Sequence, residues 1–397
     1  MAETNNNVKN IGLRGIKVAD TRISDVDGER GILIYRGYPI EELAEHSTFE
    51  ETAYLLLHDR MPNEEQFADF KKRLAEAREL PSFVFDSIRK LPTSAPPMDV
   101  LQASIPLLGI ADHELQDESR EANIFKAIRL IARIPLIVAG WDRIRNGHDP
   151  LPADETLSHA GNFLWLLKGA YPDPEIAHDL DTALILHADH SFNASTFACR
   201  AVVSTRAHMY AGVAAGVGAL SGSLHGGANA QVMKMLDELE RSGEKDVPRW
   251  VQKQLDGHAK IMGMGHAVYK TMDPRAKFLK NMCFRLGNKL GQAHWCRLST
   301  VIEETAVAEF VKRGKATIKP NVDFYSAPVY HMMGFPGDLM TPLFAVSRIA
   351  GWTSHIIEEK FGDAHGEKPA LYRPSSEYSG HYCGNEACRY TPIEERK

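Results

Sequence analysis

The sequence predicts a mainly α-helical protein with a small β hairpin near its N-terminus. Apolar residues recur at helical spacing over most of the chain, and capping residues and prolines mark where helices begin and end. One segment near the start has the short β-prone runs that are typical of paired strands. With 397 residues, of which 44% are hydrophobic and 25% charged, the chain is long enough for a large core in one or two domains.

The hairpin is expected where two β-prone runs, 23–26 and 32–35, flank Asp27-Gly28. An Asp-Gly pair tolerates the positive φ angles of a tight hairpin turn. We therefore expect two antiparallel strands joined by a tight turn at this pair.

Local signals place the helices that follow. Ser47-Thr48-Phe49-Glu50 fits a capping box ahead of an apolar run that ends near His58,. Asp173-Pro174 supplies an N-cap and a proline at the first helical position, and Pro135 is expected to kink or break its helix. Further helices are expected over 63–80, around 124–131, and over 155–168, 174–187, 193–204, 274–290, 299–313 and 341–359.

Composition excludes several classes of protein. The chain has 46 Lys and Arg residues against 52 Asp and Glu, a net charge of −6, whereas proteins that bind nucleic acids usually show a basic excess. No run approaches the roughly 18 apolar residues of a membrane-spanning helix, and the polar start resembles neither a secretion signal nor a transit peptide. Five cysteines without a disulfide spacing indicate reduced thiols,. We therefore expect a cytoplasmic protein with no nucleic-acid or membrane partner.

Two histidines lie in glycine-rich segments, His225 within 221–229 and His266 within 263–270. Glycine lets the backbone approach a ligand closely, and histidine is well suited to proton transfer near neutral pH. Each segment alone is more typical of a helix-terminating glycine beside an incidental histidine. Two such segments in one chain favour a catalytic interpretation.

An acid and several arginines complete the candidates. Asp323 stands among apolar and aromatic residues, and desolvation by such neighbours would raise its pKa and make it a better base; a helix-capping role is the alternative. Arginine is the usual partner of carboxylates because its planar fork donates two parallel hydrogen bonds, although a single arginine more often forms a surface ion pair. The candidate arginines are Arg275, Arg348 and Arg373.

Taken in order, these segments resemble the motifs of the citrate synthase family, specifically its shorter bacterial and archaeal form. The resemblance extends over nearly the whole chain. The motifs that carry it are Asp27–Gly31 with Tyr35–Gly37, Leu186–His190 with Asn193–Thr196, Leu224–Asn229, Gly265–Arg275, Pro320–Ser326 and Tyr372–Pro374.

The resemblance implies an acyltransferase that condenses acetyl-CoA with oxaloacetate and hydrolyses citryl-CoA to citrate and CoA. Asp323 would remove a methyl proton from acetyl-CoA, His225 would stabilise the enol, and His266 would polarise and protonate the oxaloacetate carbonyl. No metal and no separate cofactor are implied, because acetyl-CoA is a substrate. The carboxylates of oxaloacetate and citrate would be held by His190, Arg275, Arg348 and Arg373. CoA would be bound by Ile261, Gly263, Gly265 and Lys270.

The resemblance also implies two helical domains and a homodimer. A large domain would comprise 1–225 and 329–397, and a mobile, CoA-binding small domain would comprise 226–328 and close over oxaloacetate. Arg373 would reach the site of the partner subunit. The segment 226–328 is basic while the rest of the chain is acidic, which suits the phosphates of CoA.

Several points stay open at this stage. Many short-form members have an aromatic residue and an arginine where this chain has Met264 and Ala267, so the CoA contacts there are expected to differ. The nearest alternative function is 2-methylcitrate synthase, which uses propionyl-CoA, since one methyl group changes binding by only about 1–3 kcal/mol. A catalytically silent member with a role in assembly is a minor alternative.

A metal-binding protein is the last alternative. His187 and His190 are three residues apart, although His187 continues an apolar helical face and is expected in the core. The tail residues His381, Cys383 and Cys388 do not complete a tetrahedral zinc site, and the role of the two tail cysteines is open.

Overall fold

The computed structural model describes residues 12–13, 15–364, 366, 370–380 and 390–396. It is mainly helical, with a three-stranded antiparallel sheet of order β1-β2-β3 near the N-terminus. The strands and the first helices are β1 (Ser24–Asp27), β2 (Ile32–Tyr35), β3 (Tyr38–Pro39), α1 (Ile40–His46), α2 (Phe49–His58), α3 (Glu64–Glu76), α4 (Ser82–Ile88), α5 (Pro97–Ile110) and α6 (Arg120–Arg145). The next are α7 (His159–Lys168), α8 (Pro174–His187), α9 (Ala194–Val203), α10 (Met209–Ser221), α11 (Ala228–Ser242) and α12 (Val247–Asp256). The last are α13 (Pro274–Leu290), α14 (His294–Lys312), α15 (Val322–Met332), η1 (Gly337–Leu339), α16 (Met340–Phe361) and η2 (Ile393–Glu395).

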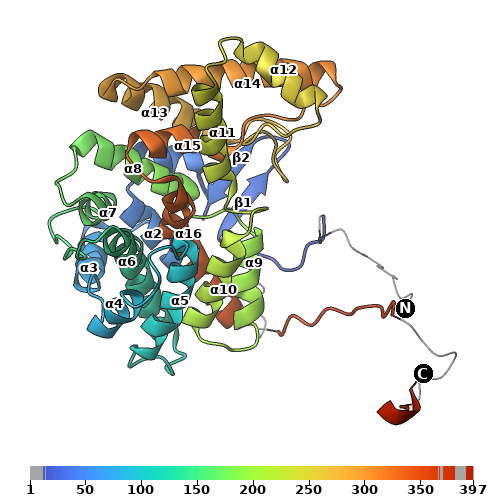
Figure 1. Cartoon of the computed structure of the whole chain (residues 1–397). Helices are drawn as coiled ribbons and strands as arrows, with labels where there is room; N and C mark the ends of the chain where they lie inside the picture. The colour runs from blue at the N-terminus through green and yellow to red at the C-terminus, as the bar shows by residue number, and fades with distance from the viewer. Residues whose placement is uncertain (1–11, 14, 365, 367–369, 381–389, 397) are drawn as a thin grey trace.

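The helices form two groups (Figure 1). Helices α11 to α14 lie together at one end of the molecule with α15 beneath them, and the other helices pack around α16. The hairpin of β1 and β2 lies where the two groups meet. The group made of α11 to α15 covers the region of the small domain expected over 226–328, and the expected end of that domain falls inside α15. The division into domains and the mobility of the small one stay predictions.

The hairpin is confirmed, but its turn is longer than expected. Asp27 pairs with Ile32, which leaves four residues in the loop, and the positive φ of +68° belongs to Gly31. Asp27 Oδ1 accepts hydrogen bonds from the backbone N–H groups of Glu29 (3.1 Å) and Arg30 (2.9 Å). The expected tight turn at Asp27-Gly28 is therefore wrong, because the Asp27 side chain stabilises a wider loop. The third strand was not expected.

Helix α2 begins one residue later than the expected capping box implies. Thr48 is the N-cap, and its side chain accepts a hydrogen bond from the backbone of Glu51. Phe49 is fully buried, and its backbone N–H donates to Asp181 at 3.0 Å. This tertiary contact selects Thr48 over Ser47 as the cap.

Pro135 does not break its helix. Helix α6 continues through it from Arg120 to Arg145. A proline within a helix costs about 3 kcal/mol or more because one hydrogen bond is lost. Most of the helix is buried, including Pro135 itself, and it packs against α7 and α16. The apolar surface that this continuous helix buries outweighs the local cost.

Helix α16 is the centre of the larger group, since every residue from Met340 to Glu359 is buried. The segment after α8 lies against its backbone, where Gly351 N–H donates to Ala188 O at 3.1 Å. A Cβ at Gly351 would lie 2.3 Å from Asp189 Oδ1 and 2.4 Å from Ala188 O. Glycine is therefore required for this close approach.

Buried charges tie α16 to α9 and to the C-terminal segment. Arg200 donates to Glu358 Oε2 at 2.6 Å and to Glu359 Oε2 at 2.8 Å. Tyr372 Oη donates to the same Glu359 oxygen at 3.1 Å. The paired carboxylates compensate the cost of burying the guanidinium, and Tyr372 holds the chain against the helices before it leaves the body of the molecule (Figure 1).

The cysteines correct the expectation of reduced thiols. Cys283 of α13 and Cys296 of α14 form a disulfide, with their Cα atoms 5.8 Å apart. Both are fully buried, because α14 folds back on α13 after Gly291. Their 13-residue separation gave no local sign of pairing. The cysteines therefore do not support the reducing, cytoplasmic compartment expected from the sequence,.

The remaining cysteines are only partly described. Cys199 is a buried free thiol, whereas Cys383 and Cys388 lie outside the described residues.

Within the described part of the chain, no helix combines the length and the apolar character needed to cross a membrane.

We predict that the disulfide contributes to stability. Closing a loop of this size is worth up to about 3 kcal/mol in the unfolded chain, so Cys283→Ser with Cys296→Ser should lower the Tm of the full chain. Mapping of peptides without reductant should recover the two cysteines in one linked pair. Separate peptides in freshly purified, alkylated protein would contradict the assignment.

Candidate active site

His225 lies in the turn between α10 and α11. Its backbone N–H donates to Gly222 O at 2.9 Å, and that of Gly226 donates to Leu220 O at 2.9 Å. A Cβ at Gly226 would lie 2.4 Å from Leu220 O. The glycine after His225 is thus required by the tight path of the backbone, which holds the imidazole at the end of α10.

Ser195, at the start of α9, determines which nitrogen of His225 carries the proton. The backbone N–H of Ser195 points at His225 Nε2 (3.3 Å), and Ser195 Oγ lies 2.8 Å from the same atom. A backbone N–H can only donate, so Nε2 accepts and the neutral ring has its proton on Nδ1. Trp352 donates to Ser195 Oγ at 3.0 Å. Burial, and then the charge of Arg348, lowers the pKa of His225 to about 4, which keeps it neutral.

His266 is held in the opposite tautomer. Its Nδ1 accepts hydrogen bonds from the backbone N–H groups of Val268 (3.0 Å) and Tyr269 (3.2 Å). The proton of the neutral ring is therefore on Nε2. Burial, and then the charge of Arg275, lowers the pKa of His266 to about 4. Both glycine-flanked histidines are thus neutral hydrogen-bond donors near neutral pH.

The segment before His266 is anchored to the strand-like approach to α15. Gly265 N–H donates to Lys319 O at 2.8 Å, and Asn321 N–H donates to Gly263 O at 2.9 Å. The two glycines have φ angles of +77° and +87°. A Cβ at Gly263 would lie 2.9 Å from the Cα of Phe324. Glycine therefore allows this segment to pack directly beside Asp323.

Asp323 lies in the first turn of α15, but it does not cap the helix. The N-cap is Asn321, whose side-chain oxygen accepts from the backbone of Asp323 at 2.9 Å and whose amide donates to Gly265 O at 2.8 Å. The Asp323 carboxyl is thus free of the capping role. Burial raises its pKa to about 7, as expected from the apolar residues beside it in the sequence.

His190 lies against the His266 segment. The ring centroids of His190 and His266 are 5.3 Å apart, and Tyr269 lies 4.8 Å from His266 and 5.5 Å from His190. Tyr269 Oη is 3.2 Å from His190 Nε2. Burial, and then Arg275, holds the pKa of His190 well below its usual value. Ser195 and Tyr269 were not predicted as site residues, although they lie within the motifs 193–196 and 265–275.

Two arginines are buried in the same region. Arg275, in the first turn of α13, forks onto Asp273 with distances of 2.9 Å from Nε and 2.7 Å from Nη2. Arg348 donates from Nε to His187 O at 2.8 Å and lies over the Phe344 ring, 4.7 Å from its centroid. Among the described residues no carboxylate lies within ion-pair distance of Arg348, where Asp189 supplies the strongest nearby negative charge, and burial lowers the pKa of Arg348 to about 10. A buried cation of this kind is a ready site for an anionic ligand.

Electrostatic coupling indicates that these groups converge. The charge of Arg275 lowers the pKa of His190, His266 and Asp323, and that of Arg348 lowers the pKa of His190 and Asp323. Such coupling decreases with distance. The structure thus gathers His190 from the segment after α8 and His266 from the segment before α13. Beside them lie Asp323 of α15, whose carboxyl titrates near neutral pH, and the guanidinium groups of Arg275 on α13 and Arg348 on α16.

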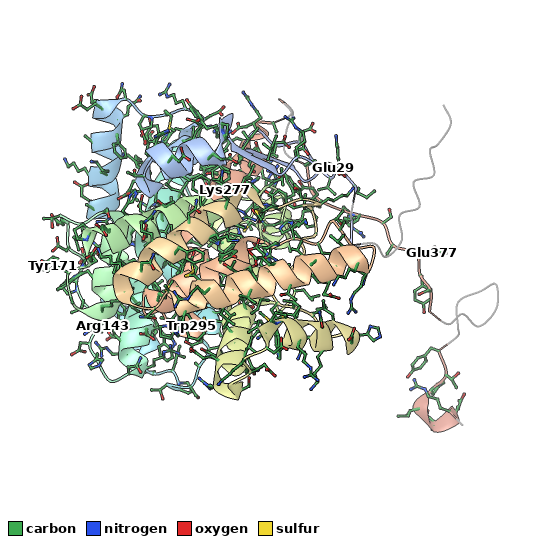
Figure 2. The ribbon with its side chains drawn as sticks, turned by 90° about the horizontal axis from the view of Figure 1, so that it is seen from above. Glu29, Arg143, Tyr171, Lys277, Trp295 and Glu377 are labelled. Carbon is green, nitrogen blue, oxygen red and sulfur yellow. A yellow bond between two sulfur atoms is a disulfide. The ribbon has the colours of Figure 1, made fainter. Side chains whose placement is uncertain are left out.

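Two predicted site residues lie elsewhere. Arg373 is exposed on the extended C-terminal segment, which leaves the body of the molecule (Figure 1), and its guanidinium donates to Pro374 O at 3.1 Å. Lys270 is exposed and forms an ion pair with Glu29 of the hairpin, which Figure 2 places at the outside of the molecule. Ile261 is buried at the start of the glycine-rich segment.

The metal candidates are only partly described. His187 is fully buried, and its Nδ1 lies 2.8 Å from Ala183 O, as expected for a core histidine. In the ranges that the structure describes, no group of three or more His, Cys, Asp or Glu side chains is placed to hold a metal ion. His381, Cys383 and Cys388 lie outside those ranges.

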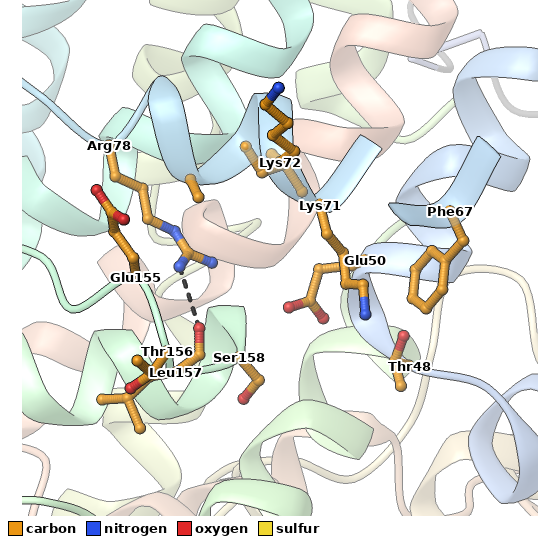
Figure 3. A pocket seen from close by; sticks show the side chains of 12 residues that line it. Thr48, Glu50, Phe67, Lys71, Lys72, Arg78, Glu155, Thr156, Leu157 and Ser158 are labelled. Atoms are coloured by element: carbon orange, nitrogen blue, oxygen red, sulfur yellow. Dashed lines mark hydrogen bonds between the residues drawn. The ribbon is translucent and has the colours of Figure 1, made fainter. Parts of the chain in front are cut away.

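A separate surface hollow of about 420 Å³ lies between α3 and the segment 155–158 (Figure 3). Arg78 closes one side by donating to Leu157 O at 3.1 Å. It contains none of the residues predicted from the sequence to form the site, so it is distinct from the histidine cluster.

Known proteins resemble the chain along nearly its whole length. A family model described as citrate synthase, C-terminal domain, matches residues 12–375. Citrate synthase of Haloferax volcanii is 41% identical over 389 residues, which cover 97% of this chain and 98% of that protein. A 2-methylcitrate synthase of Corynebacterium glutamicum is 36% identical over 390 residues, which cover 97% of each chain.

Solved structures agree with these relatives. The crystal structure of citrate synthase from Pyrobaculum aerophilum superposes with a TM-score of 0.88 at 36% identity, covering 97% of this chain and 95% of that one. The citrate synthase of Thermoplasma acidophilum, solved as a ternary complex with carboxymethyl coenzyme A and oxaloacetate, superposes with a TM-score of 0.84 at 32% identity. It covers 96% of this chain and 98% of the other.

Proposed function

The chain belongs to the citrate synthase family of acyltransferases, and we propose that it condenses acetyl-CoA with oxaloacetate and hydrolyses citryl-CoA to citrate and CoA. The observation that carries this proposal is the combination of Asp323, whose pKa is raised to about 7, with two neutral histidines of fixed and opposite tautomer. Enol chemistry needs such a set: a base matched to neutral pH and preorganised neutral donors.

The first step forms the enol of acetyl-CoA. The Asp323 carboxylate accepts a proton from the methyl group, and the electron pair of that C–H bond becomes the carbon–carbon double bond. The thioester oxygen gains negative charge and receives a hydrogen bond from His225 Nδ1–H. Ser195 supports this role because it occupies Nε2 and leaves Nδ1 as the donor.

The second step forms the carbon–carbon bond. The enol carbon attacks the ketone of oxaloacetate, so that the C=C electron pair forms the new carbon–carbon bond and the thioester C=O is restored. His266 Nε2–H gives its proton to the ketone oxygen, which becomes the hydroxyl of citryl-CoA, and the proton held by Asp323 returns through solvent to His266 Nε2. The backbone donors to Nδ1 favour a neutral imidazole for this transfer. Water then cleaves the thioester, which releases citrate and CoA.

The substrate carboxylates would be held by Arg348, Arg275 and His190. Arg348 has an unpaired, buried charge, whereas Arg275 is oriented by its pair with Asp273. For the relative from Thermoplasma acidophilum, the ternary complex with oxaloacetate and a coenzyme A analogue supports this substrate class.

CoA would lie along Ile261, Gly263 and Gly265. Ile261 and Gly263 are buried, whereas at Gly265 a Cβ would meet only Ile318 Cγ2 at 3.7 Å, so the backbone there has space beside it. Lys270 would reach the phosphates only after leaving its exposed pair with Glu29, and such pairs are weak. The small domain over 226–328 would close on the large one and exclude water from the enol.

A homodimer would bring Arg373 of each chain to the site of the other. Three observations support it. Helix α10 carries no charged residue, and α5 exposes apolar residues such as Ile110, which is 74% exposed. Tyr372 anchors the C-terminal segment just before Arg373, so the segment leaves the body at a defined place.

We expect the full chain to release free thiol when acetyl-CoA and oxaloacetate are both present. Because the 36% identical relative is a 2-methylcitrate synthase, propionyl-CoA is the comparison substrate, and kcat/KM should be higher for acetyl-CoA. A preference for propionyl-CoA would assign the alternative function. If neither acetyl-CoA nor propionyl-CoA gives thiol release with oxaloacetate, the proposed function is wrong.

The pH dependence of kcat/KM should follow the ionisation of the Asp323 carboxyl. Its folded pKa is raised to about 7, so the carboxyl is protonated below that pH and cannot accept a proton, and kcat/KM should fall as pH decreases through 7. Asp323→Asn should reduce kcat roughly 10²–10⁴-fold. A profile flat from pH 6 to 8 in the wild-type chain, with the variant active, would remove Asp323 from the mechanism.

Mixed dimers can test whether Arg373 acts across the subunit interface. Arg373→Ala and Asp323→Asn homodimers should each be nearly inactive. Refolding the two together should restore activity, because one site of each heterodimer then has Asp323 and an intact arginine from its partner. If Arg373 served its own chain, no mixture would recover activity.

A further inference from the structure

We propose that the β1–β2 hairpin, residues 24–35, is a positioning clamp that holds the His190 segment at its base and the His266 segment at its tip. This inference rests on the proposed function, in which both histidines contact oxaloacetate. It adds a role for a part of the chain that carries none of the reacting groups.

The base of the hairpin is bonded to the residues around His190. Ser24 Oγ donates to the Asp189 carboxylate and accepts from Ser191 N–H at 3.0 Å. At the paired position of the other strand, Tyr35 Oη donates to Asp189 O at 2.8 Å and accepts from Asp189 N–H at 3.1 Å. Ser24 and Tyr35 are directly opposite each other in the sheet. Both neighbours of His190 are therefore fixed by one end of the hairpin.

The tip of the hairpin is bonded to the residues after His266. Lys270 N–H donates to Gly28 O at 2.9 Å, and the Lys270 ammonium pairs with Glu29. A Cβ at Gly28 would lie 2.2 Å from Val268 O, which is a backbone atom. A Cβ at Gly31 would lie 2.7 Å from Thr271 Cγ2. At Gly28 the backbone packs on the backbone of Val268, and at Gly31 it packs on the Thr271 side chain; glycine permits both contacts,.

The clamped loop is the one that orients His266. The backbone N–H groups of Val268 and Tyr269 are the donors to His266 Nδ1, and Val268 is the residue against which Gly28 packs. Tyr269 also links the two histidines through its contact with His190 Nε2. The hairpin therefore acts on the tautomer of His266 and on the distance between the two imidazoles.

The hairpin is stiff enough for this task. Its strands are paired from Ser24–Tyr35 to Asp27–Ile32, and Asp27 Oδ1 holds the backbone of Glu29 and Arg30 in the loop. Leu33 and Tyr35 of β2 are fully buried, which fixes the hairpin to the larger group of helices.

The first test is Gly28→Ala, with Gly337→Ala as the matched control, because a Cβ at Gly337 meets nothing within 4 Å. Gly28→Ala should displace the 268–270 backbone and reduce kcat roughly 10- to 100-fold, as misplacement of a reacting group does. The KM for acetyl-CoA should change less than kcat. The control should keep wild-type kcat.

A spectroscopic readout separates this inference from the proposed function. In the full chain labelled with ¹⁵N-histidine, with His266 assigned by a His266→Gln sample, the wild-type ring should show an unprotonated Nδ1 and a protonated Nε2. Gly28→Ala should move both signals toward the average of exchanging tautomers. The measurement needs no turnover, so a protein inactive on both acyl-CoAs would overturn the function and leave this test intact.

If Gly28→Ala does not fold, a second pair of variants tests the clamp. Gly31→Ala should reduce kcat, and adding Thr271→Ala should restore part of it, because the Cγ2 that the new methyl group meets is then absent. Backbone strain from the φ of +68° is the same in both variants, so rescue isolates the contact. Wild-type kcat and an unchanged His266 spectrum in a folded Gly28→Ala, or no rescue at Thr271, would overturn the clamp.

Discussion

The segment after α8 lies directly on the backbone of α16, and this close approach sets the positions of Arg348 and His190 in the candidate site. Gly351 permits it, since any side chain there would overlap Ala188 and Asp189. Arg348, one turn earlier on α16, bonds the carbonyl of His187. One helix–segment contact thus places a guanidinium and the imidazole of His190 relative to each other.

Desolvation dominates the chemistry of the candidate site. Asp323, His225 and His266 are largely removed from water, and loss of water disfavours whichever form is charged,. The pKa of Asp323 rises while those of His225 and His266 fall, so a single physical cause produces a base matched to neutral pH and two neutral donors. The buried arginines limit the rise in Asp323, because their charge favours its carboxylate.

The hairpin connects this centre to the second group of helices. Its base is bonded beside His190 and its tip beside His266, so two segments 76 positions apart in the chain are held by four-residue strands. Positions required by such backbone contacts carry glycine and not a reactive side chain. A search of the sequence for acids, bases and nucleophiles therefore does not find these glycines.

Local signals in the sequence determined the helical class, the hairpin strands and several helix ends, such as Asp173 before α8 and Asn193 before α9, because a cap depends on neighbours within one turn. The glycine-flanked histidines and Asp323 could likewise be proposed from their flanks. The tertiary structure decided what depends on distant partners: Pro135 stays helical because its helix is buried, Cys283 meets Cys296 because two helices fold together, and Asn321 caps α15 in place of Asp323. It also decided the tautomer of His225, since Ser195 reaches that ring across 30 positions only after the chain has folded, whereas the donors to His266 come from the neighbouring Val268 and Tyr269.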